Sequence, residues 1–374
     1  MRSRGALLRR NLPLLLAAFT LSAVSNIVPQ GLLLRAEVPE RELLLSGMLL
    51  FGTAAAMAGV RAARRGWAAG RVGVATGVLA GGIGLAAHFG TTSVLAWALL
   101  GALVRFAGNH TTQATDRAAV LGAGEARAAN DSIGMTLRLA GTALPLVAFG
   151  VTWWSLGTRG LLVGLVVAGL VGATALPALP PRAPEGVDGR LTPADRALLL
   201  YGGLLFGALA VYAAQLAFLL DHHGIEQPTA WAGGLLLLAH VTAVPPLLLR
   251  TGKEAGWLDL VLPALILAAS LLPLQVGVAV GPLAMSISAG LVGLGYGAFL
   301  AALRTRVSAG EVAGRPLLAA YNDLANVAGL GAFAALGVLA WLGEQGLPFY
   351  AAVPVAIQVA AVFAALVSRR AREG

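Results

Sequence analysis

Twelve long apolar runs, joined by short loops that carry arginine on alternate sides, constrain the fold of this 374-residue chain more than any other feature. Each run has roughly 18–25 residues, the length at which a helix crosses about 30 Å of hydrocarbon. We therefore expect an all-α integral membrane protein that crosses the bilayer twelve times. The runs cover residues 12–34, 43–60, 72–89, 94–115, 129–151, 158–176, 197–220, 230–249, 257–275, 280–303, 316–341 and 347–367.

The basic residues predict which side of the membrane each loop faces. Of 26 Lys and Arg residues, 21 lie at the two ends of the chain or in the loops that follow every second run. Only Arg35, Arg41 and Arg159 lie in the intervening loops, whereas Arg105 and Arg138 fall inside apolar runs. By the positive-inside rule both termini are then cytoplasmic. We expect a multi-pass protein of the bacterial cytoplasmic (inner) membrane.

The composition excludes several classes of function. A chain that is 58% hydrophobic and 11% charged is not a soluble domain. Its net charge of +9 falls at the predicted cytoplasmic surface, where anionic lipids attract it, so we expect no nucleic-acid partner. Without cysteine, and with histidines that are scattered apart from the pair at 222–223, neither a metal nor another cofactor is expected. The sequence carries no motif of an intramembrane enzyme, and its loops are too short for a catalytic domain.

The chain divides into two similar halves. Residues 177–196 form a proline-rich, charged linker, with six apolar runs in 1–176 and six in 197–374. An Asn-Asp pair lies in each half, and the two pairs are 192 residues apart. Internal duplication of this kind is typical of transporters in which two bundles rock around a central site. We expect two pseudo-symmetric six-helix bundles, one in each half of the chain, and a protein that acts as a monomer.

Two arginines lie deep in the predicted membrane. Arg105 is about eleven residues, or roughly 17 Å, into its run, and Arg138 is about nine residues into the next. A charge at this depth costs several kcal/mol and normally faces a cavity or a partner. One interpretation is a cationic pocket for an anionic head group, because the guanidinium fork binds two oxygens. In the other, each arginine pairs with helix-end carbonyls, Asp131 or Asp323 and holds helices together.

Further polar residues inside the runs complete the predicted site. Those expected to line a substrate path, beside the two arginines, are Asn26, Gln30, Asn109, Tyr212, Gln215, Ser288, Asn322 and Asn326. Buried amides also join helices to one another, and for the last two this alternative stays open. Coupling or gating requires groups that titrate or form ion pairs. The candidates are Arg64, His110, Asp131, His240 and Asp323.

Glycines at helical spacing predict a place where two helix backbones meet. Gly290, Gly293 and Gly297 lie on one side of the run at 280–303. A side without side chains lets a second helix approach unusually closely. We therefore expect a tight helix–helix contact there.

One loop resembles a known family signature. Residues 59–66 are similar to the G-x-L-a-D-r-x-G motif of the major facilitator superfamily, with Gly59, Arg64 and Gly66 in matching positions and Ala63 in place of the aspartate. The resemblance extends over essentially the whole chain. It implies the major facilitator fold, alternating access, and a cavity lined by the first, fourth, seventh and tenth helices.

Within this superfamily, the last third is similar to bacterial lysophospholipid transporters. Asn322 and Asn326 match the two asparagines of their GAG-x-A-I-A-x-Q-N-x-x-E-N segment, whose Gln and Glu are replaced. Together with the two deep arginines and the apolar walls, this resemblance predicts a small amphipathic substrate with an anionic or zwitterionic head. The expected partners are membrane lipids and, from the titratable candidates above, protons or another coupling ion. Residues 103–106 instead resemble the start of the R-x-x-q-G motif of drug/proton antiporters. Efflux of drugs or siderophore-like compounds, and a scaffold without transport, are the alternatives.

Reporter fusions test the predicted topology. At residue 185 a reporter that works only in the cytoplasm should be active, and at residue 225 a reporter that works only outside the cytoplasm should be active. The arginine distribution places these two loops on opposite sides of the membrane. Activity on the same side at both positions would contradict the twelve-span topology.

Overall fold

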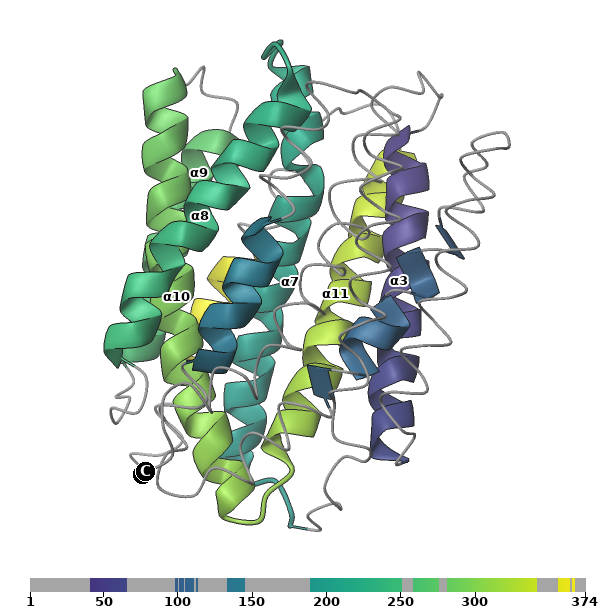
Figure 1. Cartoon of the computed structure of the whole chain (residues 1–374), viewed down its shortest axis with the longest axis vertical. Coiled ribbons are helices and arrows are strands. Elements are labelled where there is room, and N and C mark those ends of the chain that lie inside the picture. Colours follow the sequence, from purple (N-terminus) through teal and green to yellow (C-terminus); the bar gives the residue numbers. More distant parts are fainter. Residues whose placement is uncertain are drawn as a thin grey trace.

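The computed structural model describes residues 41–65, 98–99, 101–103, 105–110, 112–113, 133–144, 189–250, 258–275, 281–341, 356–363 and 365–366. Every regular element in these residues is an α-helix (Figure 1). The long helices are α3 (Arg41–Arg64), α7 (Pro193–His222), α8 (Pro228–Arg250), α9 (Leu258–Gln275), α10 (Pro282–Val312) and α11 (Leu317–Trp341). Four of them are long and apolar enough to cross a membrane, over Leu43–Arg64, Pro193–Ala213, Pro228–Leu249 and Pro282–Gly310. Twelve spans and the side of the termini stay predictions.

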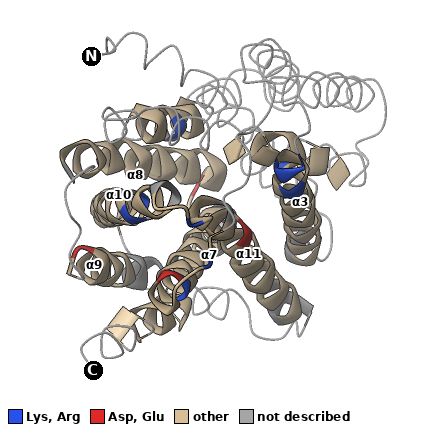
Figure 2. Cartoon of the chain, turned by 90° about the horizontal axis from the view of Figure 1, so that it is seen from below, with Lys and Arg blue, Asp and Glu red and all other residues tan. Residues whose placement is uncertain are grey.

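Helices α7 to α11 form one bundle, and α3 from the first half of the chain packs beside it. Seen along the bundle axis, α7 lies between α10 and α11, and α9 lies outside α10 (Figure 2). Helix α8 packs on α10, whereas α11 contacts both α7 and α3. The core between them is apolar and includes the buried side chains of Leu205, Leu216 and Phe299.

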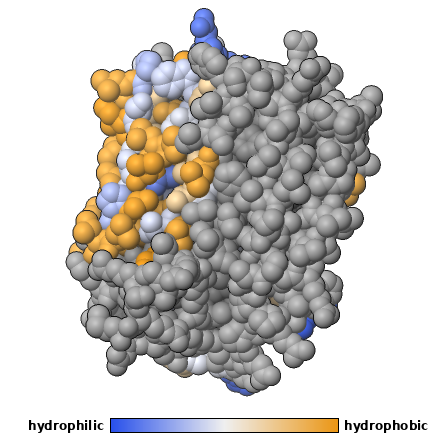
Figure 3. Space-filling model, viewed as in Figure 1, coloured by the Kyte–Doolittle hydropathy of each residue, from blue (hydrophilic) through white to orange (hydrophobic). Residues whose placement is uncertain are grey.

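Large apolar side chains also cover the outside of the bundle. Leu262, Leu283 and Ile287 are 57%, 76% and 55% exposed. The described part of the face in Figure 3 is accordingly mostly hydrophobic. Water would disfavour such a surface, whereas hydrocarbon solvates it without cost, so these residues are suited to contact lipid.

Helices α8 and α10 touch through glycine. A Cβ atom on Gly297 would lie 2.0 Å from the Ala243 carbonyl oxygen, and one on Gly293 would lie 2.1 Å from that of Ala239. Neither distance leaves room for a side chain, so the two backbones are in direct contact. The predicted close approach is confirmed at these two glycines. At Gly290 the nearest atom, of Thr242, is 4.0 Å away.

The end of the linker is fixed to the second bundle. Helix α7 begins at Pro193, four residues before the apolar run, because Thr192 and Asp195 form a capping box. Asp195 also accepts two hydrogen bonds from Arg315 Nη1, at 3.0 and 2.9 Å. A Cβ on Gly189 would lie 2.0 Å from the Gly314 carbonyl oxygen. Residues 189–192 therefore pack on the turn between α10 and α11.

Substitution of Gly297 tests the α8–α10 contact. Gly297→Ala should destabilise the protein by about 1–3 kcal/mol, since the added methyl must push two backbones apart. Gly331→Ala on α11 is the matched control, because nothing lies within 4 Å of its Cβ position and alanine favours helix. Thermal unfolding in detergent measures both. Equal melting temperatures for the two variants would show that the backbones are not in contact.

Candidate transport site

Helices α3 and α11 run antiparallel and join the two halves of the chain. Near the start of α3, Ser46 Oγ donates to the Phe333 carbonyl oxygen at 2.6 Å. A Cβ on Gly337, one turn further along α11, would lie 3.4 Å from Ser46 Cβ. Midway along the contact, the Thr53 methyl would be 3.7 Å from a Cβ on Gly329. The contact therefore continues along most of both helices.

Two polar interactions join the halves at the other end of this contact. Arg64 Nη2 lies 2.7 Å from Asp323 Oδ2, and the two side chains are 36% and 35% exposed. Beside them Asn322 Nδ2 donates to Gln113 Oε1 of the 98–113 segment. Arg64 and Asp323 were predicted separately as gating residues, and the structure brings them together. Gln113, which is buried, was missed, although it is a polar residue in the same apolar run as Arg105.

Arg105 belongs to the 98–113 segment, and its side chain contacts α3. Its Nη1 donates to Thr53 Oγ1 at 3.1 Å, and Thr53 Oγ1 donates to the Leu49 carbonyl oxygen at 2.7 Å. Gly52 makes room for the arginine, since a Cβ there would lie 2.7 Å from Arg105 Cδ. In the described part of the chain Arg105 forms no ion pair; the Asp323 carboxylate considered as its partner binds Arg64 instead.

The neighbours of Arg105 on its own helix are also polar. Asn109 Nδ2 donates to the Arg105 carbonyl oxygen at 3.0 Å, which leaves the Asn109 side-chain oxygen on the same face as Arg105. His110 is fully buried, and its ring stacks on that of Phe106 with centroids 6.5 Å apart. Arg105 and Asn109 therefore lie next to each other on one face of the helix, whereas the His110 side chain is buried within the protein.

Arg138 belongs to a second contact between the halves. Its helix, residues 133–144, packs against α8 and α10 through Met135 and Leu139. Arg138 Nη1 lies 3.6 Å from Met135 Sδ, and Thr142 Oγ1 donates to the Arg138 carbonyl oxygen at 2.9 Å. Tyr296 of α10 packs against the same apolar cluster. Arg138 thus lies at a boundary between the halves that is separate from the α3–α11 contact.

The predicted residues of the second half are spread over several helices. Ser288 Oγ donates to the Ser270 carbonyl oxygen, so this side chain joins α10 to α9. His240 Nδ1 hydrogen bonds to the Leu236 carbonyl oxygen of its own helix at 2.6 Å. Tyr212 is buried, and its hydroxyl has no hydrogen-bond partner among the described residues.

For several of the predicted site residues the structure describes no contact with another site residue. Asn326 lies on α11, one turn after Asn322, and is partly buried. Gln215 is in α7, but its side chain is not among those described. Asn26, Gln30 and Asp131 lie outside the described residues. Among the residues that are described, no group of three or more His, Asp or Glu side chains could hold a metal ion.

Comparison with known proteins identifies the fold. The sequence matches no protein-family model and no curated protein. The structure is similar to the crystal structure of the human organic anion transporter MFSD10 (TETRAN), with a TM-score of 0.65. The sequences are 15% identical, and the match covers 96% of this chain and 98% of that one. This chain therefore shares the helical fold of that transporter over nearly its whole length, whereas twelve spans and the side of the termini stay predictions.

Proposed function

We propose that this protein is a secondary transporter that moves a small amphipathic molecule with an anionic or zwitterionic head, such as a lysophospholipid, by alternating access. The fold supports a transporter rather than an enzyme. The choice of head group rests on one observation: Arg105 contacts α3 and has no carboxylate partner in the described part of the chain. MFSD10, whose fold is similar, is itself described as an organic anion transporter.

The hydrogen bonding of Arg105 leaves capacity for an anion. A guanidinium has five N–H donors, and one nitrogen of Arg105 binds the neutral hydroxyl of Thr53. A cation deep in the membrane costs several kcal/mol unless it is solvated or paired. A phosphate or carboxylate head would supply both charge and paired acceptor oxygens. We propose that Arg105, with Asn109 one turn away, binds this head group.

The composition of the apolar runs suits a hydrocarbon tail. The buried apolar residues of α3 and the 98–113 segment, which hold Arg105, include Leu45, Leu49 and Ala102. The whole chain has only five tyrosines, whereas sugar sites usually combine aromatic rings with carboxylates. Of the two runner-up functions, the resemblance of residues 103–106 to drug antiporters favours efflux over a scaffold without transport.

The contacts between the halves suit a gate. An ion pair that is about one-third exposed, such as Arg64–Asp323, contributes only about 0–1 kcal/mol and is easily broken. The neighbouring Asn322–Gln113 hydrogen bond can exchange for water when the helices separate. We propose that these two interactions close the path at the predicted cytoplasmic end, and that the Ser46–Phe333 contact closes it at the other end.

Arg105→Gln tests the anion site. Glutamine keeps a donor for Thr53 but removes the charge, so uptake of a fluorescent lysophosphatidylglycerol into proteoliposomes should fall about 10- to 100-fold, the equivalent of about 1.5–3 kcal/mol for a charged hydrogen bond. The control is Arg61→Gln, which changes an exposed arginine on α3. Thermal unfolding checks that both variants fold. Full uptake by Arg105→Gln would favour efflux of a neutral or cationic compound instead.

A reversible cross-link tests alternating access. In the double variant Ser46→Cys, Gly337→Cys the Cβ atoms would be 3.4 Å apart, close to the usual range for a disulfide, and the chain has no cysteine of its own. Oxidation should stop transport by holding α3 against α11, and reduction should restore it. The control pair is Gly47→Cys, Gly331→Cys, whose Cβ positions have nothing within 4 Å. Transport that continues in the oxidised, cross-linked protein would exclude opening at this end.

A further inference from the structure

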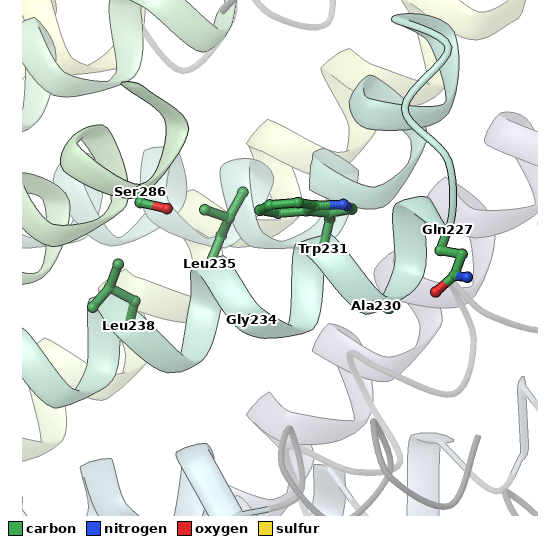
Figure 4. A pocket seen from close by; sticks show the side chains of 7 residues that line it. All are labelled: Gln227, Ala230, Trp231, Gly234, Leu235, Leu238 and Ser286. Carbon is green, nitrogen blue, oxygen red and sulfur yellow. The ribbon is translucent and has the colours of Figure 1, made fainter. Parts of the chain in front are cut away.

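A groove opens between α8 and α10 toward the ends at which both helices begin. The two backbones touch at Gly297 and Gly293, and they have separated at Gly290, where the nearest atom is 4.0 Å from the Cβ position. Beyond this point lies a cavity of about 410 Å³, lined by one side of α8 and by Ser286 of α10 (Figure 4). Its volume is in the range of small-molecule sites, roughly 300–1,000 Å³.

The groove is mostly apolar, with Gln227 at its mouth; Ser286, beside Leu235 and Leu238 at the other end (Figure 4), already donates its hydroxyl to the Pro282 carbonyl oxygen. Gln227 and Trp231 lie where α8 begins, and Gly234, Leu235 and Leu238 follow toward the membrane interior. Figure 4 shows the Trp231 ring lying along the helix toward Leu235. No charged residue lines the cavity. An occupant that fits these walls therefore has a neutral polar group above an apolar chain.

The backbone at Gln227 holds the mouth of the groove in a fixed shape. Gln227 has φ 57°, a left-handed conformation that non-glycine residues rarely adopt. Its carbonyl oxygen accepts from the backbone N–H groups of Ala230 and Trp231 at 3.0 and 3.1 Å. These bonds start helix α8, and Gln227 and Trp231 both line the opening (Figure 4).

The length of the groove matches one leaflet of a membrane. From Gln227 to Leu238 is eleven residues along the sequence, or roughly 16 Å at 1.5 Å per residue. One leaflet contributes about half of the 30 Å hydrocarbon thickness. Tryptophan is also enriched at the membrane–water interface, where its indole N–H meets the lipid head groups. The Trp231 end of the groove thus corresponds to the level of the lipid ester groups.

We propose that this α8–α10 groove binds one acyl chain of a membrane glycerolipid from the leaflet that faces Trp231, predicted to be the outer one. The ester carbonyl accepts a hydrogen bond from the Trp231 indole or the Gln227 amide, and the chain lies against Leu235 and Leu238. None of the residues that line this groove belongs to the proposed head-group site at Arg105 and Asn109, so the two sites can be tested independently.

Photolabelling in nanodiscs tests the groove. The probe is a phosphatidylcholine with a diazirine in its acyl chain, and mass spectrometry locates the labelled residues. Gly234→Leu should reduce labelling of residues 227–238 at least fivefold, because leucine fills the groove without a clash; nothing lies within 4 Å of the Gly234 Cβ position. Gly331→Leu, equally open but on α11, should leave this labelling unchanged.

Two results would overturn the proposal. One is equal labelling of residues 227–238 in the native protein and in Gly234→Leu. The other is native labelling no stronger there than at lipid-exposed leucines such as Leu262 and Leu283, which would indicate ordinary lipid contact. Labelling should persist in Arg105→Gln, so failure of the transport proposal and failure of this one are distinguishable.

Discussion

Direct contact between helix backbones at glycine is the interaction on which this structure depends. In a membrane, apolar side chains gain nothing by leaving lipid for protein, so helices associate through close packing and hydrogen bonds. The chain follows this rule within each half. A Cβ on Gly59 of α3 would lie 2.2 Å from the Phe106 carbonyl oxygen, and Gly297 of α10 is as close to α8. These contacts leave the large apolar residues free to face hydrocarbon.

Glycine also positions the polar residue on which the proposed function rests. Arg105 could not lie flat against α3 if residue 52 carried a side chain. The space at Gly52 directs the guanidinium toward Thr53, whose hydroxyl is already bonded to its own helix at Leu49. Packing and site chemistry thus depend on the same small residue. A larger residue at position 52 would change the orientation of Arg105 before it changed the fold.

The sequence predicted the bounds of α8 and the glycine contact well, because both depend on local patterns, whereas α10 continues to Val312, beyond the predicted run at 280–303. The apolar run 230–249 and helix α8 differ by at most two residues at either end, and Gly293 and Gly297 make the expected contact. The charged linker was harder. Its last residues begin α7 through the Thr192–Asp195 capping box, a local pattern that the prediction overlooked. The second partner of Asp195 is Arg315, 120 positions away, and a pattern within one segment does not show such a partner.

The residues of the candidate site stay predictions, and the contacts that they form could not be predicted from the sequence. Arg64 and Asp323 lie 259 positions apart, and no spacing indicates that they meet. Ser288 was predicted to contact substrate, yet its hydroxyl joins α10 to α9. Gln113 was missed although Asn109 and His110 of the same segment were selected; its partner Asn322 lies 209 positions away, so the contact could not be predicted from the sequence. Pairing across the halves is a property of the fold.

The contrast between contacts within a half and contacts between halves explains how such a bundle can move. Within each half, backbone meets backbone with no space for a methyl group, and a shift there would break many close contacts at once. Between α11 and the first half, the described polar contacts involve side chains: the Ser46 hydroxyl, the Asn322–Gln113 amide pair and the Arg64–Asp323 ion pair, which is about one-third exposed. Each can exchange its partner for water or a new neighbour. Together with the apolar packing of Met135 and Leu139 on α8 and α10, these side-chain contacts can rearrange more easily than the backbone contacts within each half, as the proposed alternating access requires.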